Sequence, residues 1–491
     1  MSFIFVVREG QPGVNSNGVA DVKPTAIEEK PPRAILDAVL LGLSIFLWAL
    51  FGIYTREAGT LASLWPANAF LLAMLVRFPS LATRYAFPAA LLGYFAADLL
   101  TGGTLLSTTI LTLANLAGVA LGYFLLSRMQ EDDRHLRRPQ SVLLLMLILA
   151  ASSAAAGCVG AFANKILFER GMIGGFFWWF VTEFVNYVAI VPVILTIPHG
   201  FRLRGERRRL RIPSPSLTRL APVLAFLLSA AASVAVGGPG ALAFPVPALL
   251  WCAVTYGLFG TSVLTFLFSV WTLLGIANGV LHVAPDADRD TISLRLAVML
   301  VALAPLMVAS IFEARNRLIE QLRYRAAHDD MTGVLNRVAF FEQARQMLAS
   351  ANREAQPFVV LMLDLDRFKS INDTHGHEIG DRILTSFADC LRSCLRKKDI
   401  YGRIGGEEFA ALLPDCGRAE AELVAGRIID TFSRAQFDLE TVSINATVSI
   451  GFAVRDAGQT LEALLSTADR ALYLAKNAGR NRAEYAESRL Q

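Results

Sequence analysis

The sequence predicts a multi-pass α-helical membrane domain followed by a water-soluble α/β domain. The 491-residue chain has a mean hydropathy of +0.46 and only 18% charged residues, and both values are unusual for a soluble protein. The charges are unevenly placed, because residues 34–312 are mostly apolar runs whereas residues 313–491 have an ordinary soluble composition. The net charge of +4 averages these two parts and gives no indication of nucleic-acid binding.

The chain begins with a polar segment. Residues 1–33 are rich in Gly, Pro and Asn, lack the pattern of a cleavable signal peptide, and are predicted to form a disordered cytoplasmic tail. The five cysteines show no spacing typical of metal ligands, so we interpret them as free or buried thiols.

Apolar runs long enough to cross a membrane follow within residues 34–312. A spanning helix needs about 20 apolar residues. We predict ten spans, which would place both ends of the chain on the same side of the membrane. They are residues 36–54, 61–76, 84–100, 104–126, 141–163, 173–197, 220–236, 241–257, 261–281 and 292–312.

Basic residues in the loops indicate the orientation, because cytoplasmic loops carry an excess of Lys and Arg. With the N-terminus inside, thirteen basic residues lie in cytoplasmic loops: Arg77, Arg84, Arg128, Arg134, Arg137, Arg138, Arg202, Arg204, Arg207, Arg208, Arg209, Arg211 and Arg219. The opposite loops hold four, which are Arg56, Lys165, Arg170 and Arg289. We therefore expect a multi-pass protein of the inner (plasma) membrane, in contact with lipid, whose C-terminal domain is cytoplasmic.

Polar residues inside the predicted spans are a second feature of this half, because hydrocarbon penalises them. Glu183 lies in a strongly apolar run, and Asp98, Asn68, Asn115 and Asn278 lie within or at the ends of spans. One interpretation is a ligand cavity or ion path lined by these groups. The other is interhelical hydrogen bonding that fixes the packing of the helices.

Three short stretches carry a family resemblance: Leu64–Ala69 (LWPANA), Trp178–Pro192, and Pro245 through Gly257. They resemble the MASE-type integral-membrane sensor domains of bacterial signalling proteins. Members of that family often carry Asp and Gly at the positions of Glu183 and Asn186. The resemblance covers residues 34–312 and implies a sensor domain without naming its ligand.

The segment after the last span is predicted to continue it as a helix into the cytosol. Residues 313–327 form this linker, and Ile311, Leu318, Leu322 and Arg325 give it a weak heptad-like stripe. Such a helix either pairs with a second chain and transmits motion, or serves as a simple spacer.

The soluble half reads as helix, strand, helix, β-hairpin, helix, strand, helix from Asp329 onward. Residues 357–363 form a predicted strand that ends in Asp364-Leu365-Asp366, and the GGEEF string at 405–409 is the predicted tip of the hairpin. The other predictions are helices at 383–395, 418–433 and 461–475 and a strand pair within 441–454.

Together with the GGEEF string, four motifs resemble the GGDEF-domain diguanylate cyclases over residues 326–486. They are Asp330–Arg337, Asp364–Lys369 with Asn372-Asp373, Gly376–Asp381, and Tyr473–Asn481. The resemblance implies an α+β, palm-like fold of the nucleotidyl-cyclase type over residues 328–486, with a tail at 487–491. Departures are confined to Met331, Val334 and Arg367, none of which carries catalytic chemistry.

Carboxylates from separate segments fit nucleotidyl transfer, which needs a divalent metal. A palm-like sheet would bring Asp364 next to the hairpin tip. Asp364, the Leu365 carbonyl and Glu407 are the expected ligands of Mg²⁺ or Mn²⁺, with Glu407 also a candidate base. Glu408 is expected to be a further acidic ligand or an electrostatic support.

Substrate contacts follow from the matched motifs. Lys369, Lys476 and Arg480 are expected to neutralise the triphosphate, Lys369 in a catalytic role. Asn372 and Asp381 can pair with the guanine edge, because a carboxylate accepts from its N–H groups and adenine would leave it unpaired. The remaining expected substrate-binding residues are Phe368, Gly405 and Gly406; the two glycines allow close approach of a phosphate.

Arg396-Lys397-Lys398-Asp399 ends six residues before Gly405. At this offset it matches the family's inhibitory product site, in which Arg396 and Asp399, with Arg427 as partner, would bind cyclic di-GMP. The alternative is a set of ordinary exposed charges.

The resemblance implies a membrane-bound diguanylate cyclase that condenses two GTP into cyclic di-GMP and pyrophosphate. Each domain holds one GTP, so the active state is expected to be a homodimer. Control by the membrane sensor and inhibition by the product are expected. Two other hypotheses are a GGDEF-like module that binds nucleotide without turnover, and a transporter-like sensor with a regulatory tail.

Overall fold

The computed structural model describes residues 31–55, 64–169, 171–198, 217–277, 288–354, 357–438, 443–456 and 459–487. The chain divides into two compact units, Met1–Asn316 and Arg317–Gln491, and each is described by itself. Most of the predicted tail at 1–33 lies outside the described residues, as do Asn278, Arg56, Arg170 and most of the basic loop that begins at Arg202.

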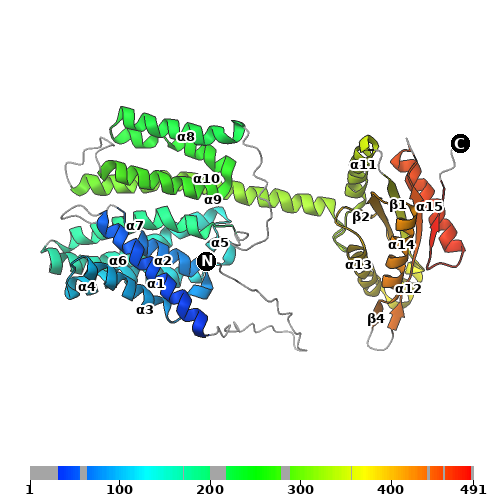
Figure 1. Ribbon diagram of the computed structural model, residues 1–491, viewed down its shortest axis with the longest axis horizontal. Helices are drawn as coiled ribbons and strands as arrows, with labels where there is room; N and C mark the ends of the chain where they lie inside the picture. The colour runs from blue at the N-terminus through cyan, green and yellow to red at the C-terminus, as the bar shows by residue number, and fades with distance from the viewer. Residues whose placement is uncertain are drawn as a thin grey trace. The chain divides into compact units, whose positions relative to one another are not determined.

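The first unit is built of helices (Figure 1). They are α1 (Pro31–Tyr54), α2 (Pro66–Arg77), η1 (Pro79–Leu81), α3 (Ala86–Leu100), α4 (Leu105–Ser127), α5 (Glu131–Arg134), α6 (Pro139–Phe168), α7 (Met172–Leu195), α8 (Leu217–Val236), η2 (Pro239–Ala243), α9 (Val246–Ala277) and α10 (Asp288–Ala327). Prolines begin α2 and α6, since a first helical residue needs no N–H partner.

Seven helices in the described part of the chain are long and apolar enough to span a membrane. Helices α2 and α3 are shorter, with 12 and 15 residues. The predicted spans at 241–257 and 261–281 both lie in α9, where a kink at Gly257, with φ of 67° and ψ of −170°, separates two helices. Each of the ten predicted spans therefore coincides with an apolar helix in the described part of the chain, with α9 counted as two, but α2 and α3 are shorter than full-length spans.

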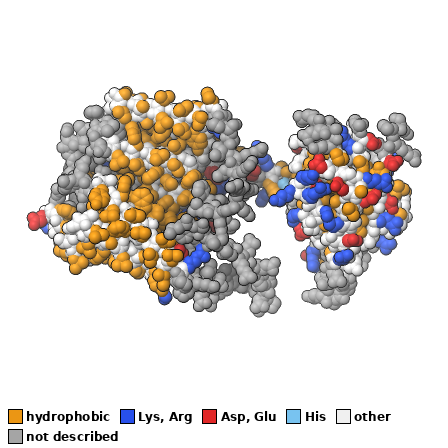
Figure 2. Space-filling view, in the orientation of Figure 1, with side chains coloured by type: hydrophobic (Ala, Val, Ile, Leu, Met, Phe, Trp, Pro, Cys, Tyr) orange, Lys and Arg blue, Asp and Glu red, His pale blue; other side chains and the backbone are white. Residues whose placement is uncertain are grey.

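Helix α7 forms the centre of this unit. In the apolar 18-residue stretch of α7, 83% of the residues are buried, whereas only 17% are buried in the corresponding stretch of α8. Residues of α1, α2, α3, α4, α6 and α7 share one core, while large apolar side chains such as Leu92 and Leu147 remain exposed. Figure 2 shows many hydrophobic side chains on the described surface of this unit, as expected of a membrane domain.

Helix α10 continues from the last predicted span through the predicted linker without interruption, as the sequence indicated. The boundary between the two compact units falls inside it, after Asn316. Ile311, Leu318 and Leu322 of the predicted stripe are all exposed in the single chain.

The second unit is a five-stranded sheet in the order β2-β3-β1-β6-β7, antiparallel except for the pair β6–β7. Its strands are β1 (Phe358–Leu365), β2 (Ile400–Arg403), β3 (Glu408–Pro414), β6 (Val448–Val454) and β7 (Ala483–Tyr485). The helices are α11 (Arg337–Glu354), α12 (Phe368–His375), α13 (His377–Cys394), α14 (Arg418–Ser433) and α15 (Leu461–Asn477).

Helices cover both faces of this sheet, which explains the uninterrupted apolar run of β1. Val359, Leu361 and Leu363 belong to the core shared with α13 and α14. The intervening Val360 and Met362 belong to the core shared with α11 and α15 (Figure 1). Because the unit has its own two cores, residues 313–491 are a suitable fragment for biochemical work.

The predicted β-hairpin, the strand before Asp364 and the helices at 418–433 and 461–475 are confirmed. Two predictions need correction. The helix predicted from 383 begins at His377, directly after Gly376, whose φ of 84° excludes it from the helix. The strands within 441–454 do not pair with each other, because β5 (Ser443–Asn445) pairs with β4 (Gln436–Asp438) in a separate sheet.

Candidate active site

Register between β1 and β3 brings the acidic residues to one end of the sheet. Asp364 is the direct partner of Glu408 in this antiparallel pair, and the Leu365 N–H donates to the carbonyl of Glu407 at 3.2 Å. The predicted metal ligands therefore lie at the same end of the sheet, Asp364 and Leu365 at the end of β1 and Glu407 directly before β3.

The turn between β2 and β3 is held by the backbone. The N–H groups of Ile404 and Gly405 both donate to the carbonyl of Glu408, at 2.9 and 3.2 Å. A Cβ atom on Gly405 would overlap the Glu408 carboxylate, whereas one on Gly406 would meet open space. Gly405 thus leaves room for the Glu408 carboxylate beside the turn, and Gly406 leaves its backbone accessible to a phosphate.

Arg403 was not singled out by the sequence analysis, although it is held against the turn. Its Nη2 and Nε atoms donate to the Gly406 carbonyl at 2.6 and 3.0 Å, and its Nη1 lies 3.2 Å from Oδ1 of Asp329. Burial alone would raise the pKa of Asp329, but hydrogen bonds from Thr332 and the Arg403 charge lower it below its ordinary value. An ion pair between two segments thus ties the hairpin tip to the start of the unit.

Lys476 is the cationic partner of Asp364. Its Nζ lies 2.8 Å from Oδ2 of Asp364, whose side chain is 6% exposed. Burial raises the pKa of Asp364, as do the nearby Glu408 and Asp366 carboxylates, and Lys476 opposes this shift. The buried carboxylate therefore needs a positive charge beside it.

Glu407 shares this electrostatic environment. Its pKa is raised by partial burial and then by the Asp364 carboxylate, and Lys476 acts against both. Two carboxylates that repel each other beside a backbone carbonyl are a donor set that fits a hard divalent cation. Within the described ranges no group of three or more His, Cys, Asp and Glu side chains is already arranged to hold a metal.

Asp366 is a structural residue whose role the sequence motifs did not indicate. Its carboxylate accepts from the hydroxyls of Ser449 (2.6 Å) and Thr447 (2.7 Å) and from the Asn481 N–H (3.0 Å). These bonds fix the left-handed segment Gly479–Asn481 against the end of β1. Both of its oxygens thus accept hydrogen bonds within the fold, whereas Asp364 pairs with Lys476 at the end of β1.

The expected guanine-binding residues lie on two packed helices, α12 and α13. Asn372 comes from α12, and Asp381 is exposed in the first turns of α13. Oδ1 of Asn372 is buried without a hydrogen-bond partner among the described residues, and it faces Gly380, where a Cβ would overlap it. Phe368 is buried beside Gly380. An unpaired acceptor of this kind is suited to a ligand N–H.

The two other residues expected to contact phosphate, Lys369 and Arg480, make no ion pair with the acidic residues in the described structure. Lys369 is exposed on α12 and forms no ion pair with any described residue. Arg480 is exposed in the left-handed segment after α15, where it lines a surface hollow with Asp366 and Arg367. The structure thus brings Lys476 to the acidic group, and it shows no contact of Lys369 or Arg480 with that group.

The predicted product site is a folded turn. The Arg396 N–H donates to Oδ2 of Asp399 at 2.7 Å, and Arg396 Nε lies 3.7 Å from the same oxygen. The Asp399 side chain is 1% exposed while that of Arg396 is 43% exposed. Arg427 donates to the carbonyl of Cys394, two residues before Arg396. Arg396 is therefore the accessible group and Asp399 the buried support.

Comparisons with known proteins agree with these two units. The family model of the diguanylate cyclase GGDEF domain matches residues 326–482, and the MASE1 model matches residues 36–316. The chain is 30% identical over 469 residues to the probable diguanylate cyclase DgcF of Escherichia coli O157:H7, covering 92% of this chain and 96% of that protein.

Two further relatives cover parts of the chain. DgcF of E. coli K12 is 34% identical over 312 residues, which are 62% of this chain and 95% of that protein. A crystal structure of the coiled coil and GGDEF domain of Caulobacter crescentus DgcB with c-di-GMP has 30% identity and a TM-score of 0.35, and it covers 35% of this chain and 93% of its own. The chain belongs to the family of diguanylate cyclases in which a MASE1 membrane domain precedes a GGDEF domain.

Proposed function

We propose that this chain joins two molecules of GTP into cyclic di-GMP and releases two pyrophosphates, with Glu407 and Asp364 as the central acidic residues. The observation that carries the proposal is their placement at one end of the sheet beside Lys476, with Asp364 near the end of β1 and Glu407 directly before β3. Incubating the purified full-length protein with GTP and Mg²⁺, and identifying the product by mass spectrometry, tests it. Pyrophosphate release without a cyclic dinucleotide would reject it.

In the proposed reaction, different residues bind the guanine base, the phosphates and the metal. Asn372 and Asp381 bind the guanine edge, and the open backbone at Gly406 lies against the phosphates. A divalent cation, Mg²⁺ or Mn²⁺, would be held by Asp364, Glu407 and the Leu365 carbonyl and would supply charge stabilisation at the phosphates. Lys476, with Lys369 and Arg480, neutralises the remaining negative charge.

The reaction itself forms a bond between a 3′-oxygen and the α-phosphorus of the other GTP. The bond from that phosphorus to the bridging oxygen of the β-phosphate breaks, and pyrophosphate leaves with the electron pair. Glu407 accepts the proton of the 3′-hydroxyl. Its raised pKa makes it a better proton acceptor than an ordinary exposed carboxylate, provided that it is ionised at the working pH.

Each domain carries one set of guanine-binding residues, so two domains must face each other. Helix α10 offers a means of pairing, because Ile311, Leu318 and Leu322 are exposed apolar residues on its cytosolic extension. We place the homodimer contact there. Replacing Leu318 and Leu322 with Glu should lower activity at low protein concentration. Raising the concentration of the variant should restore part of that activity.

We place the protein in the plasma membrane with the GGDEF domain in the cytoplasm, because the loops predicted to be cytoplasmic hold the excess of Arg. Single cysteines at positions 288 and 208 test this by labelling of intact cells. The exposed native Cys158 must first be replaced by Ser. A membrane-impermeant maleimide should label position 288 and not position 208, and the reverse pattern would reject the topology.

Product inhibition is the last part of the proposal. Arg396, with Arg427 beside it, offers an exposed guanidinium for the phosphates of cyclic di-GMP, and Asp399 holds the turn that presents it. A ligand that joins this turn to a neighbouring domain would keep the two GTP sites apart.

A further inference from the structure

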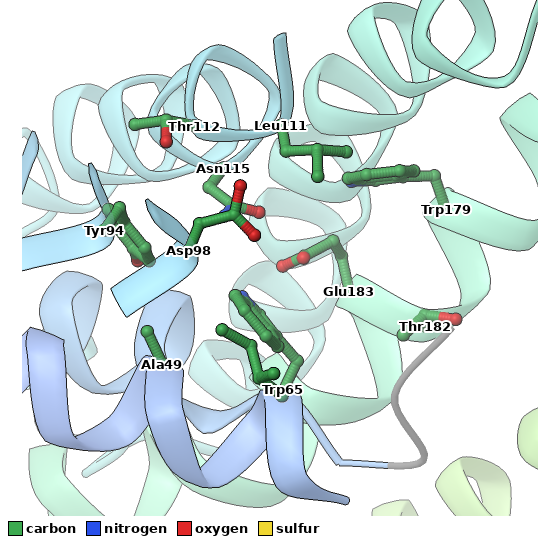
Figure 3. A pocket seen from close by; sticks show the side chains of 11 residues that line it. Ala49, Trp65, Tyr94, Asp98, Leu111, Thr112, Asn115, Trp179, Thr182 and Glu183 are labelled. Atoms are coloured by element: carbon green, nitrogen blue, oxygen red, sulfur yellow. The ribbon is translucent and has the colours of Figure 1, made fainter. Parts of the chain in front are cut away.

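A cavity lies inside the membrane unit, between helices α1, α3, α4 and α7 (Figure 3). Its volume is about 50 Å³, enough for a few water molecules at about 10–15 Å³ each. The residues that line it include Trp65, Tyr94, Asp98, Trp179, Thr182 and Glu183. Figure 3 shows the carboxylates of Asp98 and Glu183 directed into this space.

A hydrogen-bond network holds one oxygen of Glu183 and leaves the other free. The Asn68 amide donates to Glu183 Oε1 at 2.7 Å and to Asn115 Oδ1 at 3.0 Å. The Asn68 carbonyl oxygen accepts from Tyr94 (2.5 Å) and from the Trp65 indole (3.3 Å). Asn68 is thereby fully used, and it fixes the orientation of the Glu183 side chain.

The second oxygen, Oε2, is buried without a partner among the residues that the structure describes. Glu183 is 3% exposed, so a partner for Oε2 would have to enter the cavity that Glu183 lines. An unsatisfied buried carboxylate oxygen is costly, and inside a membrane protein such a group marks a functional site. Hydrogen bonding that serves helix packing alone would have used Oε2 as well.

The lining defines the chemistry of a matching ligand. Asp98 and Glu183 are the charged residues among the eleven described lining residues, and no basic side chain accompanies them. Trp65, Tyr94 and Trp179 add three aromatic rings. Carboxylates combined with aromatic rings are suited to organic cations, because the ring faces attract positive charge that the carboxylate neutralises. The small volume restricts the ligand to a small ammonium group.

The cavity is also connected to α10. Thr182 lines it, and the Oγ1 of Thr182 accepts a hydrogen bond from Nη1 of Arg295 at 2.5 Å. Arg295 is buried, and its guanidinium lies over the Trp178 ring. A ligand that displaces Thr182 would therefore change the contact of the helix that leads to Ala327.

We propose that this cavity is the binding site of a small organic ammonium ion and that Glu183 Oε2 is its counter-ion. The inference extends the proposed function by naming the class of ligand that the membrane domain senses. Binding is measured without GTP turnover, so a failure here and a failure of the cyclase reaction can be told apart.

The test uses the full-length protein in nanodiscs and follows tryptophan fluorescence, since Trp65 and Trp179 line the cavity. Methylammonium, ethylammonium and tetramethylammonium chlorides are titrated against NaCl at equal ionic strength. At least one ammonium ion should give a saturable change that NaCl does not give. Glu183→Gln keeps an oxygen acceptor for Asn68 and removes the charge, and it should weaken binding at least about tenfold.

Two variants make the test specific. Glu131→Gln, the same change in α5 away from the cavity, should bind as the wild type does. Glu183→Asp keeps the charge on a shorter side chain and should lie between wild type and Glu183→Gln, which separates loss of charge from misfolding. The proposal is overturned if no ammonium ion saturates, if NaCl gives the same response, or if Glu183→Gln and wild type bind equally.

Discussion

Nζ of Lys476 lies 2.8 Å from Oδ2 of Asp364, so a residue expected to bind substrate phosphate is paired with one expected to bind metal. The pair joins the end of α15 to the end of β1. Because Asp364 is almost fully buried, Lys476 has a structural role in addition to its role toward the nucleotide.

Lys476→Met in the 313–491 fragment should therefore lower the free energy of unfolding by about 1–3 kcal/mol, since it leaves the Asp364 charge buried without a partner. Lys369→Met is the matched control, because Lys369 is exposed and forms no ion pair with any described residue, and its effect should stay within about 0.5 kcal/mol. Both variants should bind GTP more weakly. Urea denaturation checks the difference, and equal losses of stability would contradict the structural role.

Gly380→Ala should displace the Asn372 amide, because the new Cβ would overlap Oδ1 of Asn372. We expect the KM for GTP to rise about tenfold, the cost of one lost hydrogen bond. Gly426→Ala on α14 is the matched control, since open space surrounds that position. It should stabilise the fragment by about 0.5–1 kcal/mol and leave KM unchanged. An unchanged KM in Gly380→Ala would count against Asn372 as a guanine ligand.

Arg396→Ala should retain catalysis and lose product inhibition. A charge-assisted bond is worth about 1.5–3 kcal/mol, so the inhibition constant for cyclic di-GMP should rise roughly 10- to 150-fold. Arg392→Ala removes an exposed guanidinium from the nearby end of α13, where it pairs with Asp389, and should not change that constant. Inhibition measured by product titration decides the matter. If both variants behave like the wild type, the Arg396 turn is only surface charge.

Arg295→Gln should uncouple the membrane cavity from the catalytic unit. The variant weakens the bond to Thr182 without altering the residues that line the cavity. The fluorescence response to the binding ammonium ion should persist, while the effect of that ion on the rate of the cyclase should disappear. Arg84→Gln, an exposed residue that bonds Tyr85, should keep both responses. A rate response retained in Arg295→Gln would show that the signal does not pass through this contact.

The sequence predicted much of the catalytic unit because local patterns determine it. The apolar run of β1 follows from burial on both faces, and the hairpin follows from the glycines and the flanking apolar residues. The roles of Asp366 and Arg403 could not be predicted in this way, because their partners lie elsewhere in the chain. Asp366 bonds to Thr447, Ser449 and Asn481, and Arg403 bonds to Asp329.

Prediction of the membrane unit from the sequence is limited for a different reason. Hydropathy placed the break at Gly257 and the end of α2 correctly, but it did not show that α2 begins only at Pro66 and is too short for a full span. Polar residues in apolar runs did indicate a site, since Glu183 and Asp98 line the cavity and Asn68 and Asn115 support it. The free Oε2 of Glu183 became evident only from the arrangement of four helices around it.

Glu407→Gln should abolish activity without lowering the stability of the fold. Burial and the Asp364 charge raise the pKa of Glu407, so the folded state holds its proton more tightly than the unfolded state does. Its contribution to stability therefore falls as the pH rises above the ordinary carboxyl range. Without metal, the Gln variant of the fragment should melt at or above the wild-type temperature at pH 7.5, with a smaller difference near pH 4. A clearly lower melting temperature at pH 7.5 would contradict this electrostatic account.

The most direct measurement compares the product formed by full-length wild type and Glu407→Gln from GTP with Mg²⁺, by mass spectrometry. The wild type should form cyclic di-GMP, and removal of metal with EDTA should stop the reaction. Glu407→Gln should form none at equal protein concentration, because it lacks the charge that binds metal and accepts the proton. Cyclic di-GMP made by Glu407→Gln at the wild-type rate, or none made by the wild type, would contradict the assignment of the active site.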